Sequence, residues 1–150
     1  MTSARAVRFR ELERPEIDGI LARNRIGRIA YTTGEDVFIA PVHYVYDDPW
    51  IYGRTTRGEK LAATRAHWRV AFEVEEVEGP LDWRTVVVRG GLYVFEPEGS
   101  DSDREAWERA LRALHSVFPE AFTDADPVPF RSVLFGIAVQ HVTGREARSG

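Results

Sequence analysis

The sequence contains no cysteine among its 150 residues. Disulfides, cysteine nucleophiles, zinc–thiolate centres and cysteine-ligated iron–sulfur clusters are therefore excluded. The formal net charge is −4, so no basic excess supports binding to nucleic acid. No apolar run approaches the roughly 20 residues that a membrane-spanning helix needs. The N-terminal stretch MTSARAVRFRELERPE lacks the apolar centre of a signal peptide, so we expect a cytoplasmic protein without nucleic-acid or membrane partners.

Lysine is almost absent too. Lys60 is the only one, and every other basic residue is arginine. A genome biased towards arginine codons explains the arginines, but it explains less well why one lysine remains at this position. The rest of the composition is that of a folded protein, with 43% hydrophobic and 29% charged residues. This length and balance predict one domain over residues 1–150, with 1–10 as a flexible lead-in.

Hydrophobic periodicity predicts three helices and six strands. The helices are expected from about Leu12 to Asn24, over 58–66 and over 103–118, and the strands over 27–32, 37–46, 50–54, 69–77, 83–95 and 132–143. Ser102 with Glu105 predicts a capping box at the start of the last helix. Consecutive strands joined by short turns favour antiparallel pairing. The sequence therefore predicts an α+β protein built on a small, closed, six-stranded barrel.

Some strand residues give more detail. Pro41 implies an edge position or a bulge within its strand, and Gly90-Gly91 indicates a bulge. The runs 86–88 and 133–139 are apolar on both faces, whereas a half-exposed strand would alternate. We therefore expect both faces of these strands to be covered, one of them by a second subunit.

A candidate phosphate site is the segment RTTRGEK, residues 54–60, between a predicted strand and a predicted helix. A helix N-terminus carries unsatisfied N–H groups and a partial positive charge. Arg57 and Lys60 are therefore unfavourable there unless an anion is bound. Two threonine hydroxyls add donors, and the glycine spacing differs from that of a Walker loop. A polar turn with solvated charges remains the alternative.

The other chemistry-bearing residues give weaker patterns. The four histidines lack the spacing of a metal site, and none is predicted. His43, on the long strand, is either a ligand-facing residue or an ordinary sheet residue. Glu73 and Glu75 alternate with apolar side chains, which is typical of an exposed strand face rather than of acid–base catalysis. No catalytic side chain is predicted.

Four segments occur in an order that is typical of one family. They are LARNRIGRIAY (21–31), FIAPVHYVYDDPWIYGRT (38–55), RGEKLAATRAHWRVAFEVEE (57–76) and WRTVVVRGGLYVFE (83–96). In this order the chain resembles the pyridoxamine 5′-phosphate oxidase-like, flavin-binding split barrels, and most of all the branch that includes the nitroimidazole-resistance proteins. The resemblance implies a six-stranded antiparallel Greek-key split barrel with flanking helices. It also implies a homodimer with flavin sites at the subunit interface.

The resemblance further implies which residues contact the cofactor, FMN. Lys60 would meet the phosphate, and Arg54 and Thr55 would line the phosphate and the ribityl chain. Residues 41–44 would lie along the isoalloxazine ring, which 85–86 would approach from another side. The implied cofactor-binding residues are Pro41, Val42, His43, Tyr44, Arg54, Thr55, Lys60, Thr85 and Val86.

The chain also departs from the pyridoxamine phosphate oxidases proper. Ala40 and Val45 stand where those enzymes carry an arginine and a lysine, and Glu59 replaces a second basic residue. The C-terminal end, TGREARSG, lacks their substrate-binding Arg-x-His. Oxidation of pyridoxamine phosphate itself is therefore not expected.

The resemblance implies an FMN-dependent oxidoreductase that acts on a small molecule or electron acceptor. Two alternatives stay open. A deazaflavin (F420)-dependent reductase would need more basic residues around the phosphate loop, and Arg57 and Arg65 could serve. A flavin-binding or haem-binding protein without turnover is the other alternative, with His43 as a candidate haem ligand.

Overall fold

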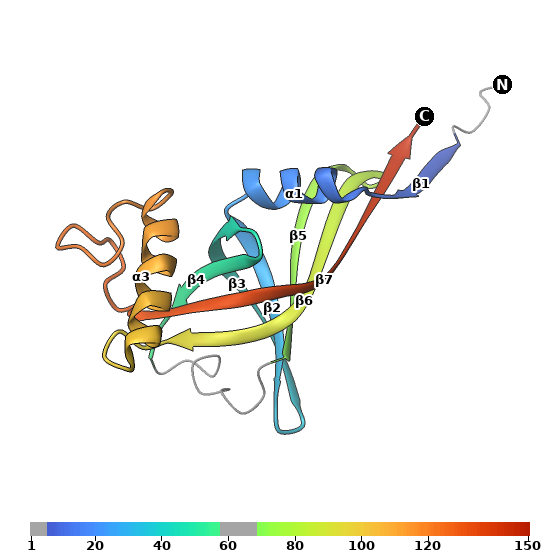
Figure 1. Ribbon diagram of the computed structural model, residues 1–150. Helices are drawn as coiled ribbons and strands as arrows, with labels where there is room; N and C mark the ends of the chain where they lie inside the picture. The colour runs from blue at the N-terminus through green and yellow to red at the C-terminus, as the bar shows by residue number, and fades with distance from the viewer. Residues whose placement is uncertain (1–5, 58–68) are drawn as a thin grey trace.

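The structure is a computed structural model that describes residues 6–57 and 69–150. Its elements are β1 Val7–Glu11, α1 Arg14–Arg23, β2 Ile26–Thr33, β3 Asp36–Asp47, β4 Trp50–Thr55, β5 Arg69–Gly79, β6 Asp82–Phe95, α3 Asp101–His115 and β7 Val133–Ser149 (Figure 1). The helix predicted over 58–66 lies outside the described residues. Neither helix in the described ranges is long and apolar enough to cross a membrane.

The strands form one antiparallel sheet that closes on itself. Six of them make a ring in the order β7, β4, β3, β2, β5 and β6, and β6 pairs again with β7. β1 adds a seventh strand on the outer side of the C-terminal half of β7. The predicted α+β class and six-stranded split barrel are confirmed. The predicted strand positions are correct to within two residues, except that β7 continues to Ser149 instead of ending at 143.

The barrel encloses the main hydrophobic core, because each strand turns alternate side chains inward. Phe72 and Val74 of β5 face Val86 and Val88 of β6, and all four are buried. Helix α1 covers one end of the barrel with its buried apolar side chains, Ile17, Ile20 and Leu21. The alternation of apolar and polar residues that predicts the strands thus corresponds to side chains that face the core and the surface in turn.

A second core lies outside the barrel, between α3 and the strands beside it. Leu134 of β7 packs there with Ala110 and Leu114 of α3, whereas its neighbours Phe135 and Ile137 point into the barrel. The expectation that both faces of this apolar run are covered is confirmed for these residues. The expectation that a second subunit covers one face is wrong here, because α3 of the same chain does so.

Three predictions at element ends are wrong. Residues 7–10 were expected in a flexible lead-in, but they form β1, which pairs with the end of β7 from Val7–Ser149 to Glu11–Arg145. The cap of α3 is Ser100 rather than Ser102. The Ser100 hydroxyl accepts a hydrogen bond from the Asp103 N–H, and the Asp103 carboxylate accepts one from the Ser100 N–H at 2.9 Å. The helix also ends at His115, three residues before the predicted end.

Charged side chains form a row across four strands beneath α1. Arg10 of β1, Glu146 of β7, Arg84 of β6 and Glu76 of β5 are in register. Glu146 is 5% exposed and accepts from the Nε of Arg10 at 2.9 Å and of Arg84 at 2.6 Å. Burial alone would raise the pKa of Glu146, but these two hydrogen bonds lower it overall. We call these four residues the charge row.

Helix α1 covers both ends of the charge row. Its Glu16 accepts two hydrogen bonds from Arg10, which lower the pKa of Glu16 to about 2. Its Arg23 donates two to Glu76. At each end of the charge row, the strand residue thus pairs with a residue of α1 that carries the opposite charge. These two ion pairs hold α1 over the sheet.

Candidate functional site

The candidate site lies where β3 and β4 separate. The two strands pair between Tyr44–Gly53 and Asp47–Trp50. Among the described residues, the earlier part of β3 pairs only with β2, and the end of β4 pairs only with β7. Pro41 therefore stands at an edge facing β4, where its missing N–H removes no ladder hydrogen bond. This confirms the predicted edge position and identifies the opening of the split barrel.

A small hollow of about 150 Å³ occupies this opening, and we call it the β3–β4 hollow. One wall consists of small and apolar residues of β3, and the other consists of polar residues at and after the end of β4. Its lining residues are Tyr31, Ala40, Pro41, Val42, Arg54, Thr55, Thr56 and Arg131. The structure thus brings together four of the nine predicted cofactor-binding residues, Pro41, Val42, Arg54 and Thr55. A flat apolar wall beside hydroxyls and guanidinium groups suits a planar ring that carries an anionic tail.

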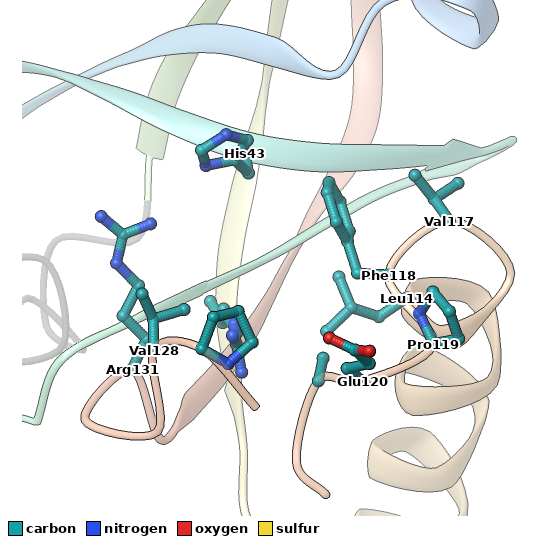
Figure 2. Close-up of a pocket in the computed structure, with 11 residues that line it drawn as sticks. His43, Leu114, Val117, Phe118, Pro119, Glu120, Val128 and Arg131 are labelled. Atoms are coloured by element: carbon teal, nitrogen blue, oxygen red, sulfur yellow. The ribbon is translucent and has the colours of Figure 1, made fainter. Parts of the chain in front are cut away.

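A larger cavity of about 440 Å³ adjoins the hollow. It lies between β3, β4, the end of α3 and the segment 116–132, which we call the covering loop (Figure 2). His43 lies over this cavity, with its ring edge-on to Phe118 at 5.8 Å between centroids. Arg54 and Arg131 line both spaces. We call this cavity the loop pocket.

The charge of Arg54 is already compensated inside the protein. Its guanidinium donates two hydrogen bonds to Asp126 of the covering loop, at 2.6 and 2.7 Å, and it lies 5.2 Å from the centroid of the Phe122 ring. Asp126 also accepts from the N–H groups of Phe122 and Val128. The Arg54 hydrogen bonds, with those two backbone bonds, hold the pKa of Asp126 far below its ordinary value, against the opposing effect of burial. Arg54 therefore fixes the covering loop.

Three of the predicted residues lie away from both spaces. Tyr44 is fully buried, and its hydroxyl donates to the Leu21 carbonyl at 2.7 Å. Val86 is fully buried in the barrel core, and Thr85 is half-buried beside it on β6. Neither of these two lines the hollow or the loop pocket. Lys60 lies outside the described residues, so its role stays a prediction.

Sequence reasoning missed Asp126, Arg131 and Phe118 as parts of the site. Asp126 is 72 positions from Arg54, and no local pattern connects them. The covering loop has no periodicity, so nothing in the sequence shows which face it takes. Within the described ranges, no group of three or more histidine and carboxylate side chains could hold a metal ion.

Comparison with known families agrees with this architecture. The model of the family described as pyridoxamine 5′-phosphate oxidase matches residues 13–146. An uncharacterized protein of Rhizobium meliloti is 26% identical over 149 residues, which cover 94% of this chain and 97% of the relative.

Two solved structures are also similar. A FAD-binding protein of Mesorhizobium loti has a TM-score of 0.72 and 26% identity, over 93% of this chain and 99% of that one. A candidate 5-nitroimidazole antibiotic resistance protein of Bacteroides thetaiotaomicron has a TM-score of 0.71. Its identity is 15%, over 97% of this chain and 91% of the other, so it bears on the fold alone.

Proposed function

Because this chain belongs to the pyridoxamine 5′-phosphate oxidase family, we propose that it is a flavoprotein that binds FMN at the opening between β3 and β4. One observation carries the proposal. The β3–β4 hollow lies at the opening of the split barrel, and it is lined by Pro41, Val42, Arg54 and Thr55. The family resemblance implies that these four residues contact a flavin. The similar Mesorhizobium protein is named for binding FAD, which supports a flavin of some kind.

The residues of the hollow fit such a group. Ala40, Pro41 and Val42 offer an apolar edge against which a flat ring can lie, and Thr55 and Thr56 offer hydroxyl donors to an anion. Arg54 is neutralised by Asp126. We therefore expect the positive charge that meets the flavin phosphate to come from Lys60, as the family resemblance implies, with Arg57 in the same predicted phosphate segment.

A bound flavin would supply hydride transfer, and the protein would supply binding, orientation and exclusion of water. Val42 and its neighbours on β3 would orient the ring. Tyr44 and Val86 can contact a cofactor only through their backbones, because both side chains are fully buried. We propose an oxidoreductase that acts on a small molecule other than pyridoxamine phosphate, since Ala40 and Val45 depart from the oxidase pattern. A cytoplasmic location stays a prediction.

We also propose a homodimer. Four apolar side chains project outward from β2 and β3 beside the opening. They are Ile26, Val37, Ile39 and Pro41. Val37 is 76% and Ile39 70% exposed, which is unusual for adjacent outward positions on a sheet unless a partner covers them. A second copy on this face would complete a site that is open to solvent in one chain.

The experiment is to identify the cofactor. The purified protein should show flavin absorption bands, and mass spectrometry of the released cofactor should identify FMN. Apoprotein is then titrated with FMN, FAD, deazaflavin F420 and haem. FAD is the second candidate, favoured by the 26% identical structure that is named for it. If no flavin co-purifies and none binds at tens of micromolar, the proposal fails. A haem Soret band that disappears in His43→Ala would support haem binding instead.

A further inference from the structure

The loop pocket has the size and lining of a small-molecule site. Its volume of about 440 Å³ falls within the roughly 300–1,000 Å³ of such sites. The walls are mostly apolar and include Leu114, Phe118, Pro127 and Val128. The pocket is separate from the β3–β4 hollow but adjoins it, because Arg54 and Arg131 line both.

The pocket has few polar side chains, and they differ in whether their charge is already compensated. The charge of Arg54 is compensated by Asp126, and both terminal nitrogens of its guanidinium already donate to that carboxylate. Arg131 is half-buried, and no carboxylate of residues 6–57 or 69–150 forms an ion pair with it. Glu120 is exposed and lies on the opposite side of the pocket from Arg131 (Figure 2). The pocket is therefore positive at one end and acidic only at its rim.

We propose that the loop pocket binds a small aromatic carboxylate, whose carboxylate pairs with Arg131 and whose ring lies against Phe118 and Leu114. The proposal rests on the proposed function in one respect, namely that this ligand is the substrate beside the flavin. Binding itself needs no flavin, because none of the pocket's features depends on one.

The choice of ligand follows from the lining. A guanidinium forms paired hydrogen bonds with a carboxylate, and this recognition is stronger in a partly desolvated site than in water. The ring of Phe118 offers an aromatic face or edge to a planar ligand. A cationic ligand would instead meet the positive charge of Arg131, which forms no ion pair with a carboxylate of the described residues.

The experiment compares two ligands of the same shape on the flavin-free protein. 2-Naphthoate and the neutral 2-naphthamide are titrated by calorimetry. The carboxylate should bind at least tenfold more tightly than the amide to the unaltered protein. Arg131→Gln should remove this difference, while Arg104→Gln, a matched loss of one exposed arginine on α3, should keep it. Glu120→Gln should leave naphthoate binding unchanged or tighten it.

Two further measurements test where naphthoate binds and whether FMN competes with it. Amide chemical shifts of residues 114–131 should change on addition of naphthoate. Naphthoate affinity should stay within threefold when FMN is present at saturation.

Competition between FMN and naphthoate would overturn the proposal, because the anion site would then belong to the cofactor. Equal binding of naphthoate and naphthamide to the unaltered protein would also overturn it, whether or not Arg131→Gln folds. Naphthoate binding in a protein that binds no flavin would support the pocket and refute the proposed function.

Discussion

Arg54 and Asp126 form a doubly hydrogen-bonded ion pair between the end of β4 and the covering loop, with N–O distances of 2.6 and 2.7 Å. The side chains are 11% and 3% exposed, so the pair is largely shielded from solvent. Asp126 also anchors two backbone N–H groups of the loop. One carboxylate thus determines both the path of the loop and the shape of the loop pocket.

Asp126→Asn should destabilise the protein by about 3 kcal/mol, because Arg54 would remain buried without a counter-charge. Denaturant unfolding measures this loss. The control is Asp124→Asn, which makes the same change at an exposed residue two positions away. It should change the free energy of unfolding by less than about 0.5 kcal/mol. Equal effects of the two substitutions would show that the pair contributes nothing specific.

The contribution of Asp126 should depend on pH. Its pKa is lower in the folded protein than in the unfolded chain, so its stabilising effect is complete above the unfolded value near 4. The effect is lost as the pH falls from there through the folded pKa. The gap in melting temperature between the unaltered protein and Asp126→Asn should be constant from pH 6 to 8 and narrow below pH 4. A gap that widens on acidification would contradict the assigned direction.

Gly90→Ala should lower the free energy of unfolding by about 2 kcal/mol or more, which is the cost of severe overpacking in a core. A Cβ at Gly90 would lie 1.7 Å from the Ala138 carbonyl oxygen, at the bulge where β6 and β7 shift register. Gly79→Ala is the matched control, since its Cβ meets nothing closer than 3.7 Å. Thermal unfolding of both variants provides the test. Similar melting temperatures would mean that β6 and β7 can separate at little cost.

Lys60→Ala should weaken FMN binding at least tenfold without loss of the fold. A compact ammonium beside a phosphate contributes a charge-assisted contact that alanine cannot replace. Flavin fluorescence titration measures the affinity, and circular dichroism checks the fold. Arg104→Ala removes an exposed charge elsewhere and serves as the control. Undiminished affinity in Lys60→Ala would make the lone lysine an accident of composition.

Ile39→Asp should dissociate the proposed dimer while leaving the monomer folded, because an exposed side chain contributes little to the barrel itself. Sedimentation velocity reports the change in mass. Val77→Asp, which alters another exposed apolar residue on β5, should leave the dimer intact. The reverse outcome would place the interface at the end of β5 rather than on β3.

The barrel could be predicted because its strands carry local signals. Each of three signals lies within a few residues of the backbone feature that it predicts. They are the alternation of polar and apolar residues in β5, the proline at the edge position 41 and the glycine at the bulge at 90. β1 carried the same signal, since Val7 and Phe9 alternate with arginines, but five residues with a partner some 136 positions away are hard to distinguish from a tail. The cap was missed because two serines fit the spacing, and Asp103 fills the role assigned to Glu105.

The candidate site was only partly predictable. The hollow follows from strand pairing, and the four predicted residues that line it stand close together in sequence on β3 and β4. The loop pocket depends on where residues 116–132 turn back, and this is decided by a pair that joins Arg54 to Asp126. Contacts of this kind leave no periodic pattern, so only the three-dimensional structure shows them.

The charge row also bears on the order in which the chain can fold. Glu146 is opposite both Arg10 and Arg84, and a slip of β1 by one residue towards Arg145 would set Arg10 against a like charge. The charge row therefore specifies one register between β1 and β7 among several that the backbone would allow. Glu146 follows Arg10 by 136 positions, so β1 has no correct partner until the strands between them have been synthesised. Among the described strands, β1 thus comes first in the chain and can pair only after β7, which comes last.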